Sequence, residues 1–216
     1  MFITLEGIEG SGKTSQVNPI VTYLESIGLD CAITREPGGT QIGEKIRAIL
    51  LDPASSGLDP MAELLLYMAD RAQHIHETII PWLRAGKTVV CDRFFDATAA
   101  YQGYARQQDI ALIHRLHALL FSTLTPDITL LLDLPPAVGL ARAWQQIHQG
   151  QRRDMETRFE KEAVAFHERV RAGYLALAKR EPRRFHIIDA EQDQDQVTRQ
   201  IIRTLSAAMR QTAKTA

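Results

Sequence analysis

Gly7-Ile8-Glu9-Gly10-Ser11-Gly12-Lys13-Thr14 is the stretch that decides the fold of this chain. Two glycines with four residues between them, followed by Lys and Thr, match the phosphate-loop pattern. A β-prone run, 2–6, comes directly before it, and a predicted helix from about 13 to 27 follows. Glycines let consecutive backbone N–H groups turn toward an anion, and the helix start adds the positive end of its dipole. The stretch therefore predicts a cradle for the phosphates of a nucleoside triphosphate.

Two side chains at the end of this loop extend the prediction. We expect the Lys13 ammonium to reach the β- and γ-phosphates, and the Thr14 hydroxyl to bind the magnesium ion that bridges them. A chance glycine-rich turn is the alternative, and the position of the loop between a strand and a helix argues against it. The residues expected to hold the triphosphate here are Gly7, Glu9, Gly10, Ser11, Gly12, Lys13, Thr14 and Ser15.

The composition is that of an ordinary globular protein and narrows the class. The 216 residues are 45% hydrophobic and 24% charged, with a net charge of -1, so one domain is expected, with no bulk attraction to nucleic acid or to an anionic membrane. Cys31 and Cys91 fall in predicted buried strands without disulfide or metal-site spacing, which favours a reducing compartment. The chain begins directly with a strand and holds no long apolar run, so we expect a cytoplasmic protein.

Apolar strand-like runs alternate with helical stretches along the chain. This alternation predicts an α/β fold with a five-stranded parallel sheet and helices on both of its faces. The expected strands are 2–6, 31–35, 88–92, 128–134 and 185–189. Ligands of such sheets bind beyond the carboxyl ends of the strands. Chemistry is therefore expected near the polar residues that end them, which are Glu6, Arg35, Asp92, Asp133 and Asp189.

Two segments could supply a second ligand site. Arg35 precedes a Pro-Gly-Gly turn at a strand end, where it would suit a second phosphate, although such an arginine taken alone is more often a solvated strand end. Tyr67 and Arg71 are four residues apart, so an aromatic ring and a planar donor share one helix face. Spacing alone favours the simpler interpretation, a core tyrosine with an exposed arginine.

Asp92-Arg93 ends the third strand beside the predicted phosphate loop. The Asp92 carboxylate is well placed to hold the water ligands of magnesium, and the Arg93 guanidinium could bind an acceptor phosphate through two hydrogen bonds. A structural ion pair is the alternative. The accompanying motifs favour the functional interpretation.

These motifs together resemble bacterial thymidylate kinase. The resemblance is carried by 6–14, Thr34-Arg35-Glu36-Pro37-Gly38-Gly39-Thr40, Ala69-Asp70-Arg71-Ala72-Gln73-His74, Asp92-Arg93-Phe94 and Ala100-Tyr101-Gln102-Gly103, and it continues through 158–160 and 169–175 to 188–190. It covers almost the whole chain. It implies a P-loop fold like that of nucleoside monophosphate kinases, spanning 1–216 as one domain, and transfer of the γ-phosphoryl group of ATP to dTMP for dTTP synthesis. A homodimer is implied as well, for which the helix around 61–80 could supply the interface.

The resemblance also assigns roles to single residues. Arg35 and Arg93 would grip the dTMP phosphate, Glu9 would accept from the 3′-hydroxyl, and Tyr101 would crowd the sugar 2′ position. The base would meet Tyr67, which replaces the usual Phe, together with Arg71, Thr98 and Gln102, and Pro37 completes the implied dTMP site. Arg142 would face the adenine of ATP with the loop after Asp189. Asp92 and Thr14 would support Mg²⁺.

The polar stretch within about 143–158 is expected to be a lid. It carries Arg152, Arg153 and Arg158, and a mobile basic lid would exclude water while stabilising charge in the transition state. The phosphate loop itself has no Arg, so the lid arginines should take that task, with Arg153 and Arg158 as the expected catalytic pair. A solvated basic helix face is the alternative. The lid is longer than the family pattern, and Thr157 stands where an Asp is usual.

Two other functions stay open at this point. One is a kinase for another nucleoside monophosphate or for a free deoxynucleoside, although the latter would need a base for its 5′-hydroxyl, whereas Arg35 and Arg93 suit an acceptor that is already phosphorylated. The other is a nucleotide-operated switch without phosphoryl transfer. The Asn-Lys-x-Asp motif that reads guanine is absent from the sequence.

Overall fold

The computed structural model of the protein describes residues 1–121, 124–150 and 154–215. Five parallel strands form one sheet in the order β2-β3-β1-β4-β5, as the alternation of the sequence predicts. The strands are β1 (Phe2–Glu6), β2 (Cys31–Arg35), β3 (Thr88–Asp92), β4 (Ile128–Asp133) and β5 (Phe185–Asp189). Their bounds agree with the sequence prediction except that β4 ends one residue earlier. The predicted fold class is therefore confirmed.

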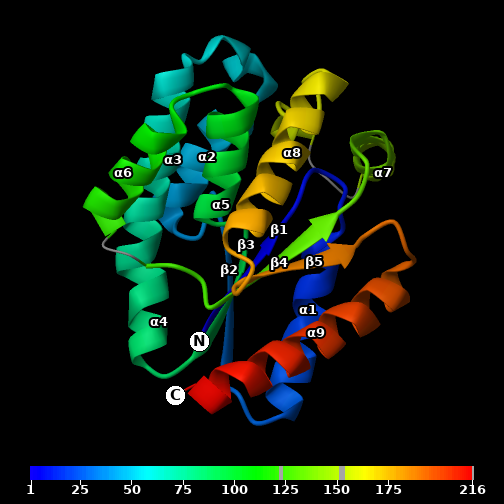
Figure 1. The fold of residues 1–216 in the computed structure, drawn as a ribbon. Coiled ribbons are helices and arrows are strands. Elements are labelled where there is room, and N and C mark those ends of the chain that lie inside the picture. Colours follow the sequence, from blue (N-terminus) through cyan, green and yellow to red (C-terminus); the bar gives the residue numbers. More distant parts are fainter. Residues whose placement is uncertain (122–123, 151–153, 216) are drawn as a thin grey trace.

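Helices cover both faces of the sheet (Figure 1). They are α1 (Lys13–Ser26), α2 (Gln41–Leu51), α3 (Pro60–His74), α4 (Ile80–Arg84), α5 (Phe95–Thr98), α6 (Ile110–Phe121), α7 (Pro136–His148), α8 (Val164–Arg180) and α9 (Gln194–Thr215). Short turns of 3₁₀ helix cover Pro53–Gly57 and Asp154–Glu156, and π-helical turns cover Ile75–Ile79 and Ala99–Ala105. Helices α1 and α9 pack together on one face, while α8 packs on the turn after α5 on the other.

Local sequence explains where several helices begin and end. The Thr40 hydroxyl accepts from the Gly43 N–H at the start of α2, and Asp59 caps α3 by accepting from the N–H groups of Met61 and Ala62. Helix α1 runs through Pro19 and ends at Ser26, and Gly28 follows in the left-handed conformation with φ of 87°. The glycine thus ends the first helix as its sequence predicts.

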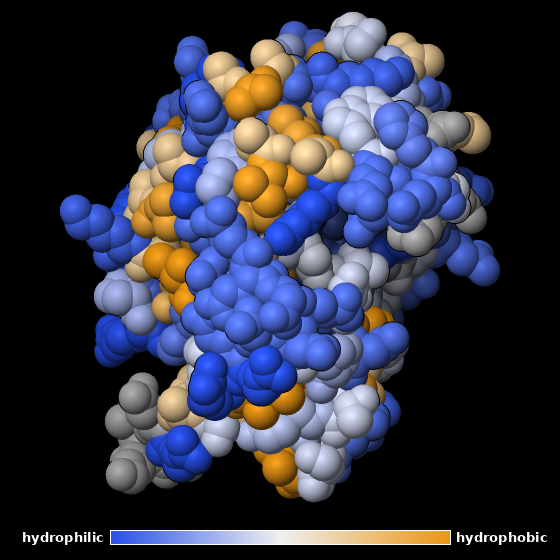
Figure 2. Space-filling model, turned by 90° about the vertical axis from the view of Figure 1, so that its right-hand side faces the viewer, coloured by the Kyte–Doolittle hydropathy of each residue, from blue (hydrophilic) through white to orange (hydrophobic). Residues whose placement is uncertain are grey.

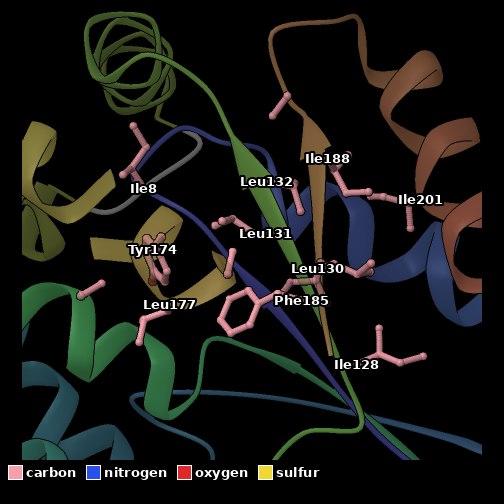
Figure 3. Packing of buried hydrophobic residues seen from close by; sticks show 14 of the residues in the cluster. Ile8, Ile128, Leu130, Leu131, Leu132, Tyr174, Leu177, Phe185, Ile188 and Ile201 are labelled. Carbon is pink, nitrogen blue, oxygen red and sulfur yellow. The ribbon is translucent and has the colours of Figure 1, made fainter. Parts of the chain in front are cut away.

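The core lies on both faces of the sheet because alternate side chains of each strand point to opposite sides. Leu131 of β4 points toward Tyr174 and Leu177 of α8, whereas Ile188 of β5 lies beside Ile201 of α9 (Figure 3). The outer face seen in Figure 2 is largely hydrophilic, with its hydrophobic residues in separate groups. Among the described residues, no helix is both long and apolar enough to cross a membrane.

The register of the strands brings their carboxyl ends to one edge. Leu5 of β1 pairs with Asp92 of β3, and Arg35 of β2 pairs with the same Asp92. The phosphate loop leaves β1 beside the end of β3 for this reason. This edge is where the predicted site residues gather.

Candidate active site

One cavity of about 810 Å³ opens at the carboxyl edge of the sheet. It is lined by the phosphate loop, by the ends of β2 and β3, by α2 and α3, by the turn after α5 and by the segment 156–160. The predicted residues that line it are Glu9, Gly10, Ser11, Gly12, Lys13, Thr14, Ser15, Arg35, Pro37, Tyr67, Arg71, Asp92, Arg93, Thr98, Tyr101 and Gln102. The structure thus brings together both predicted ligand sites in one space.

The phosphate loop wraps around the Lys13 ammonium. The Nζ atom donates to the carbonyl oxygens of Gly7 at 2.9 Å and Ile8 at 2.8 Å, and to Ser11 Oγ at 3.2 Å. Gly10 has φ of 68°, and a Cβ atom there would lie 1.9 Å from the carbonyl oxygen of Gly139 in α7. Only glycine lets the loop lie this close to α7. The hydrogen bonds of Lys13 and the close contact with α7 therefore both hold the loop in its conformation.

Gly7 lies where the chain leaves β1 for the phosphate loop, and its predicted contact with the triphosphate stays a prediction. It does not lie among the cavity-lining residues, and a Cβ atom there would approach the Leu132 carbonyl oxygen of β4 to 2.5 Å. Its backbone conformation, with φ of 142°, lets the chain leave β1 against its neighbouring strand. Gly7 thus shapes the entrance to the loop.

Thr14 and Asp92 meet at the mouth of the loop. The Thr14 hydroxyl donates to Asp92 Oδ2 at 2.8 Å, so a hydroxyl and a carboxylate stand side by side at the start of α1. Magnesium prefers such oxygen ligands together with phosphate oxygens. Within the described ranges, no group of three or more His, Cys, Asp or Glu side chains could hold a metal by itself. The pair fits a magnesium ion that bound phosphates help to hold.

Arg93 lines the cavity beside the phosphate loop. Its backbone has φ of 70°, which is unusual for a residue with a side chain. The guanidinium donates to Glu9 Oε1 at 3.1 Å and to the Tyr174 hydroxyl at 3.2 Å, and lies 4.9 Å from the centre of the Tyr101 ring. A cation held this rigidly next to the phosphate loop suits an anionic ligand.

Arg35 lies on the open side of the same cavity. Its Nη2 atom pairs with Glu44 Oε1 at 2.6 Å, and 48% of its side chain is exposed. An exposed pair of this kind contributes little stability, so the guanidinium can leave Glu44 for a phosphate at small cost. Arg35 and Arg93 thus offer one mobile and one fixed cation.

The other end of the cavity is built around Arg71. This arginine is 1% exposed and donates to Glu36 Oε2 at 2.8 Å, to Thr98 Oγ1 at 2.9 Å and to the Phe94 carbonyl oxygen at 3.2 Å. Tyr67, one helical turn earlier on α3, lines the same space. The interpretation of an exposed arginine, which spacing alone favours, is wrong because Glu36 neutralises the guanidinium in the interior.

Glu9 joins the phosphate loop to three other elements. It accepts from the Tyr101 hydroxyl at 2.6 Å, pairs with Arg93, and has its Oε2 atom 3.1 Å from His167 Nδ1 of α8. Burial alone would raise the pKa of Glu9, but the contact with His167 and the charge of Arg93 outweigh it and hold this pKa well below its ordinary value. Glu9 therefore remains an ionised acceptor at the centre of the cavity.

The three arginines that the sequence predicts in the lid are Arg152, Arg153 and Arg158. Arg158 does not line the cavity: its guanidinium pairs with Glu63 and donates to the Leu50 carbonyl oxygen at 2.9 Å. In this conformation its guanidinium faces Glu63 and not the cavity, and its predicted catalytic role stays a prediction. Arg152 and Arg153 lie outside the described residues.

Arg142 also lies outside the cavity lining. It donates to the carbonyl oxygens of Ala190 at 2.7 Å and Glu191 at 3.1 Å, and thereby joins α7 to the loop after β5. The resemblance implies that the same two segments face the adenine of ATP. The structure brings the two segments together through Arg142.

Three of the polar strand ends serve the fold and not the cavity. Glu6 is fully buried and accepts from the Phe94 N–H and the Tyr174 hydroxyl. Asp133 pairs with Arg171 through two hydrogen bonds, and Asp189 caps the loop that follows it. Of the five polar residues that end the strands, Arg35 of β2 and Asp92 of β3 line the cavity, and the phosphate loop that follows β1 lines it as well.

Sequence reasoning missed several residues of the site. Glu36 orients Arg71, Arg47 of α2 pairs with Glu156 at 2.6 Å, and Glu63 accepts from Gln102 Nε2 at 2.7 Å. Glu36 comes directly after Arg35 in the sequence, but its partner Arg71 is 35 residues further along the chain. The partners of Arg47 and Glu63 are distant in sequence, and no local sequence pattern indicates these pairs.

The pKa of Lys13 yields a first prediction. Burial, together with the charge of Arg93, lowers this pKa from 10.5 to about 8, so the free protein begins to lose the ammonium proton near pH 8. A bound polyphosphate favours the charged form and raises the pKa. Nucleotide affinity should therefore fall as the pH rises through 8, and binding at pH 8.5 should take up a proton.

Calorimetric titration with ATP in two buffers of different ionisation enthalpy measures this proton uptake. Lys13→Arg is the matched control, because a guanidinium keeps its proton throughout and should show no uptake at pH 8.5. Equal proton uptake by the unchanged chain and by Lys13→Arg would contradict the assignment.

The sheet order, the phosphate loop after β1 and the second cationic site beside it define a class of protein. They are the features of a phosphate-loop kinase that acts on nucleoside monophosphates. The thymidylate kinase family model matches residues 5–201. This chain belongs to the thymidylate kinase family.

Individual relatives agree with this assignment. The chain is 58% identical over 190 residues to the thymidylate kinase of Desulfosudis oleivorans, covering 88% of this chain and 89% of the relative. It is 56% identical over 202 residues to that of Desulforapulum autotrophicum, covering 94% and 89% respectively. The crystal structure of thymidylate kinase from Ehrlichia chaffeensis superposes with a TM-score of 0.75 at 38% identity, covering 95% of this chain and 98% of that one.

Proposed function

We propose that this chain transfers the γ-phosphoryl group of ATP to the 5′-phosphate of dTMP, giving dTDP for dTTP synthesis. The observation that carries this proposal is the single cavity that joins the phosphate loop to the buried Arg71 and Thr98, with Arg35 and Arg93 on its walls. Such a space suits two nucleotides that meet through their phosphates. Family membership supports the same reaction.

The proposed roles follow from the chemistry of each group. The phosphate-loop amides and Lys13 hold the triphosphate, and Arg35 and Arg93 hold the acceptor phosphate in line with it. Because the acceptor is already an anion, positioning and charge neutralisation carry the reaction, and no general base is required. Glu9 would accept from the sugar 3′-hydroxyl, and Tyr101 beside it would crowd the 2′ position.

The end of the cavity around Arg71 would bind the pyrimidine base. Tyr67 offers a ring for stacking, while the Arg71 guanidinium and the Thr98 hydroxyl offer hydrogen bonds along the base edge. Thr14 and Asp92 would hold magnesium, which supplies charge neutralisation at the β- and γ-phosphates. Their contact at 2.8 Å supports this assignment.

The segment of about 143–158 is proposed to act as a lid of the single domain. Gln146 and Glu156 from its two ends line the cavity, and the ion pair between Arg47 and Glu156 ties its far end to α2. Arg152 and Arg153 remain predicted charge stabilisers of the transferred phosphoryl group, on sequence grounds alone.

A homodimer is also proposed. Helices α2 and α3 pack against each other and carry large hydrophobic residues that are about half exposed: Ile42 (47%), Ile49 (47%), Met61 (42%) and Leu65 (53%). Exposed apolar residues gathered on neighbouring helices favour a protein partner, and a second copy is the occupant that the sequence resemblance implies. Sedimentation of a monomer at every concentration would remove this proposal.

A coupled assay with ATP and a panel of acceptors tests the proposed reaction. We expect dTMP to exceed dCMP in kcat/KM by at least ~10²-fold, and thymidine to be inactive because it lacks the phosphate that Arg35 and Arg93 hold. Omission of magnesium should abolish turnover. Activity on thymidine without activity on dTMP would overturn the proposal in favour of a deoxynucleoside kinase.

A further inference from the structure

Gln102 lines the base end of the cavity, yet its amide group is committed to a residue behind it. The Nε2 atom donates to Glu63 Oε1 at 2.7 Å, and Glu63 itself is completely buried at 0% exposure. A carboxylate only accepts hydrogen bonds, so it can receive the NH₂ end of the amide and not the carbonyl end. The oxygen of Gln102 is therefore the atom left for a ligand.

Glu63 is itself held in place by two arginines. Arg158 donates to its Oε2 atom, and Arg106 donates to Oε1 at 3.4 Å and to Oε2 at 3.3 Å. Arg106 also pairs with Glu162 at 2.6 Å. Arg106 comes directly after the turn that follows α5, and Arg158 lies in the segment before α8, so both arginines hold the carboxylate without belonging to the cavity lining. The orientation of the Gln102 amide is thus imposed by a network that the ligand does not touch.

The orientation of the Gln102 amide affects which pyrimidine the cavity can bind. Thymine presents a donor at N3 and an acceptor at O4, whereas cytosine presents an acceptor at N3 and a donor at N4. A cavity that offers the Gln102 oxygen as acceptor and the Arg71 guanidinium as donor matches thymine and opposes cytosine. Glu63 thus determines which end of the Gln102 amide faces the base.

We propose that Glu63 is a positioning residue that determines pyrimidine specificity, by holding the Gln102 NH₂ group away from the base so that its oxygen meets the N3–H of thymine. This inference rests on the proposed function and adds a residue that contacts neither nucleotide. It predicts that specificity changes when Glu63 loses its purely accepting character, even though its size is kept.

Glu63→Gln is the informative variant. Two guanidinium groups will draw the new amide oxygen toward themselves, which turns the new NH₂ group toward Gln102. Gln102 then has to flip and present its own NH₂ group to the base. We expect the ratio of kcat/KM for dTMP to that for dCMP to fall by at least ~10-fold, with the value for dCMP unchanged or raised.

Glu162→Gln is the matched control, since it neutralises a carboxylate of the same network on Arg106 without touching the pair of Glu63 and Gln102. It should leave the ratio unchanged. A parallel fall of both acceptors in Glu63→Gln, with the ratio unchanged, would mean that Glu63 serves the fold alone and would overturn the inference. An unchanged chain that fails to phosphorylate dTMP would instead refute the proposed function.

A measurement on the unchanged chain covers the case in which Glu63→Gln does not fold. dTMP methylated at N3 lacks the donor that the Gln102 oxygen is proposed to accept, so its kcat/KM should be lower than that of dTMP by at least ~10-fold. Equal use of dTMP and its N3-methyl derivative would overturn the inference.

Discussion

Replacing Arg93 with alanine is expected to lower kcat/KM for dTMP by about 10²–10³-fold while changing the dissociation constant of ATP less than about threefold. The guanidinium is held rigidly by Glu9 and the Tyr174 hydroxyl, so it is preorganised for the acceptor phosphate and for charge that develops during transfer. Initial-rate kinetics over both substrates, with separate ATP titration, measure the two effects.

Two controls separate this role from a structural one. Arg93→Lys keeps the charge but loses the planar fork, so an intermediate loss is expected. Arg115→Ala removes an exposed arginine of α6 and should leave kcat/KM unchanged. An Arg93→Ala enzyme with an unaltered Michaelis constant and turnover for dTMP would show that another group binds the acceptor phosphate.

Gly10→Ala is expected to damage both stability and catalysis. The new Cβ atom would lie 1.9 Å from the Gly139 carbonyl oxygen in a backbone conformation with φ of 68°. Strain and overpacking together should cost at least about 3 kcal/mol of unfolding free energy. Displacement of the phosphate loop should lower kcat/KM by at least ~10²-fold, because small misplacements of reacting groups are costly.

Gly28→Ala is the matched control for this change. Gly28 has φ of 87° and open space around its Cβ position, and it follows α1 far from the cavity. It should cost about 1 kcal/mol from backbone strain and leave kcat/KM unchanged. Urea unfolding and initial rates on both variants make the comparison. Similar losses for Gly10→Ala and Gly28→Ala would mean that the contact with α7 is unimportant.

The sheet and the phosphate loop could be predicted because their signals are local. Buried parallel strands are short apolar runs, and the glycines of the loop lie directly between one such run and a helix. Arg35, Asp92 and Arg93 could be located at the cavity because the carboxyl ends of parallel strands meet at one edge. Local spacing and the topology rule together were enough for this half of the site.

The buried charges of the base end could not be predicted in the same way. Arg71 has the pattern of an exposed residue of α3 until Glu36, which directly follows β2, is brought beside it. Glu63 meets Gln102 and Arg158 only after three distant segments pack together. Charged side chains are buried where an ion pair or hydrogen bonds compensate for the lost hydration. When the two partners are distant in the sequence, no periodic sequence pattern indicates that they pair. The resemblance named Arg71 and Gln102 but not the carboxylates that orient them.

A crystal structure with dTMP and a non-hydrolysable ATP analogue bound is the most direct test of where the two nucleotides bind. We expect the triphosphate within the loop formed by Gly7 to Thr14, with the guanidinium groups of Arg35 and Arg93 within hydrogen-bond distance of the dTMP phosphate. A dTMP phosphate that lies away from both arginines, or a triphosphate outside the loop, would contradict it.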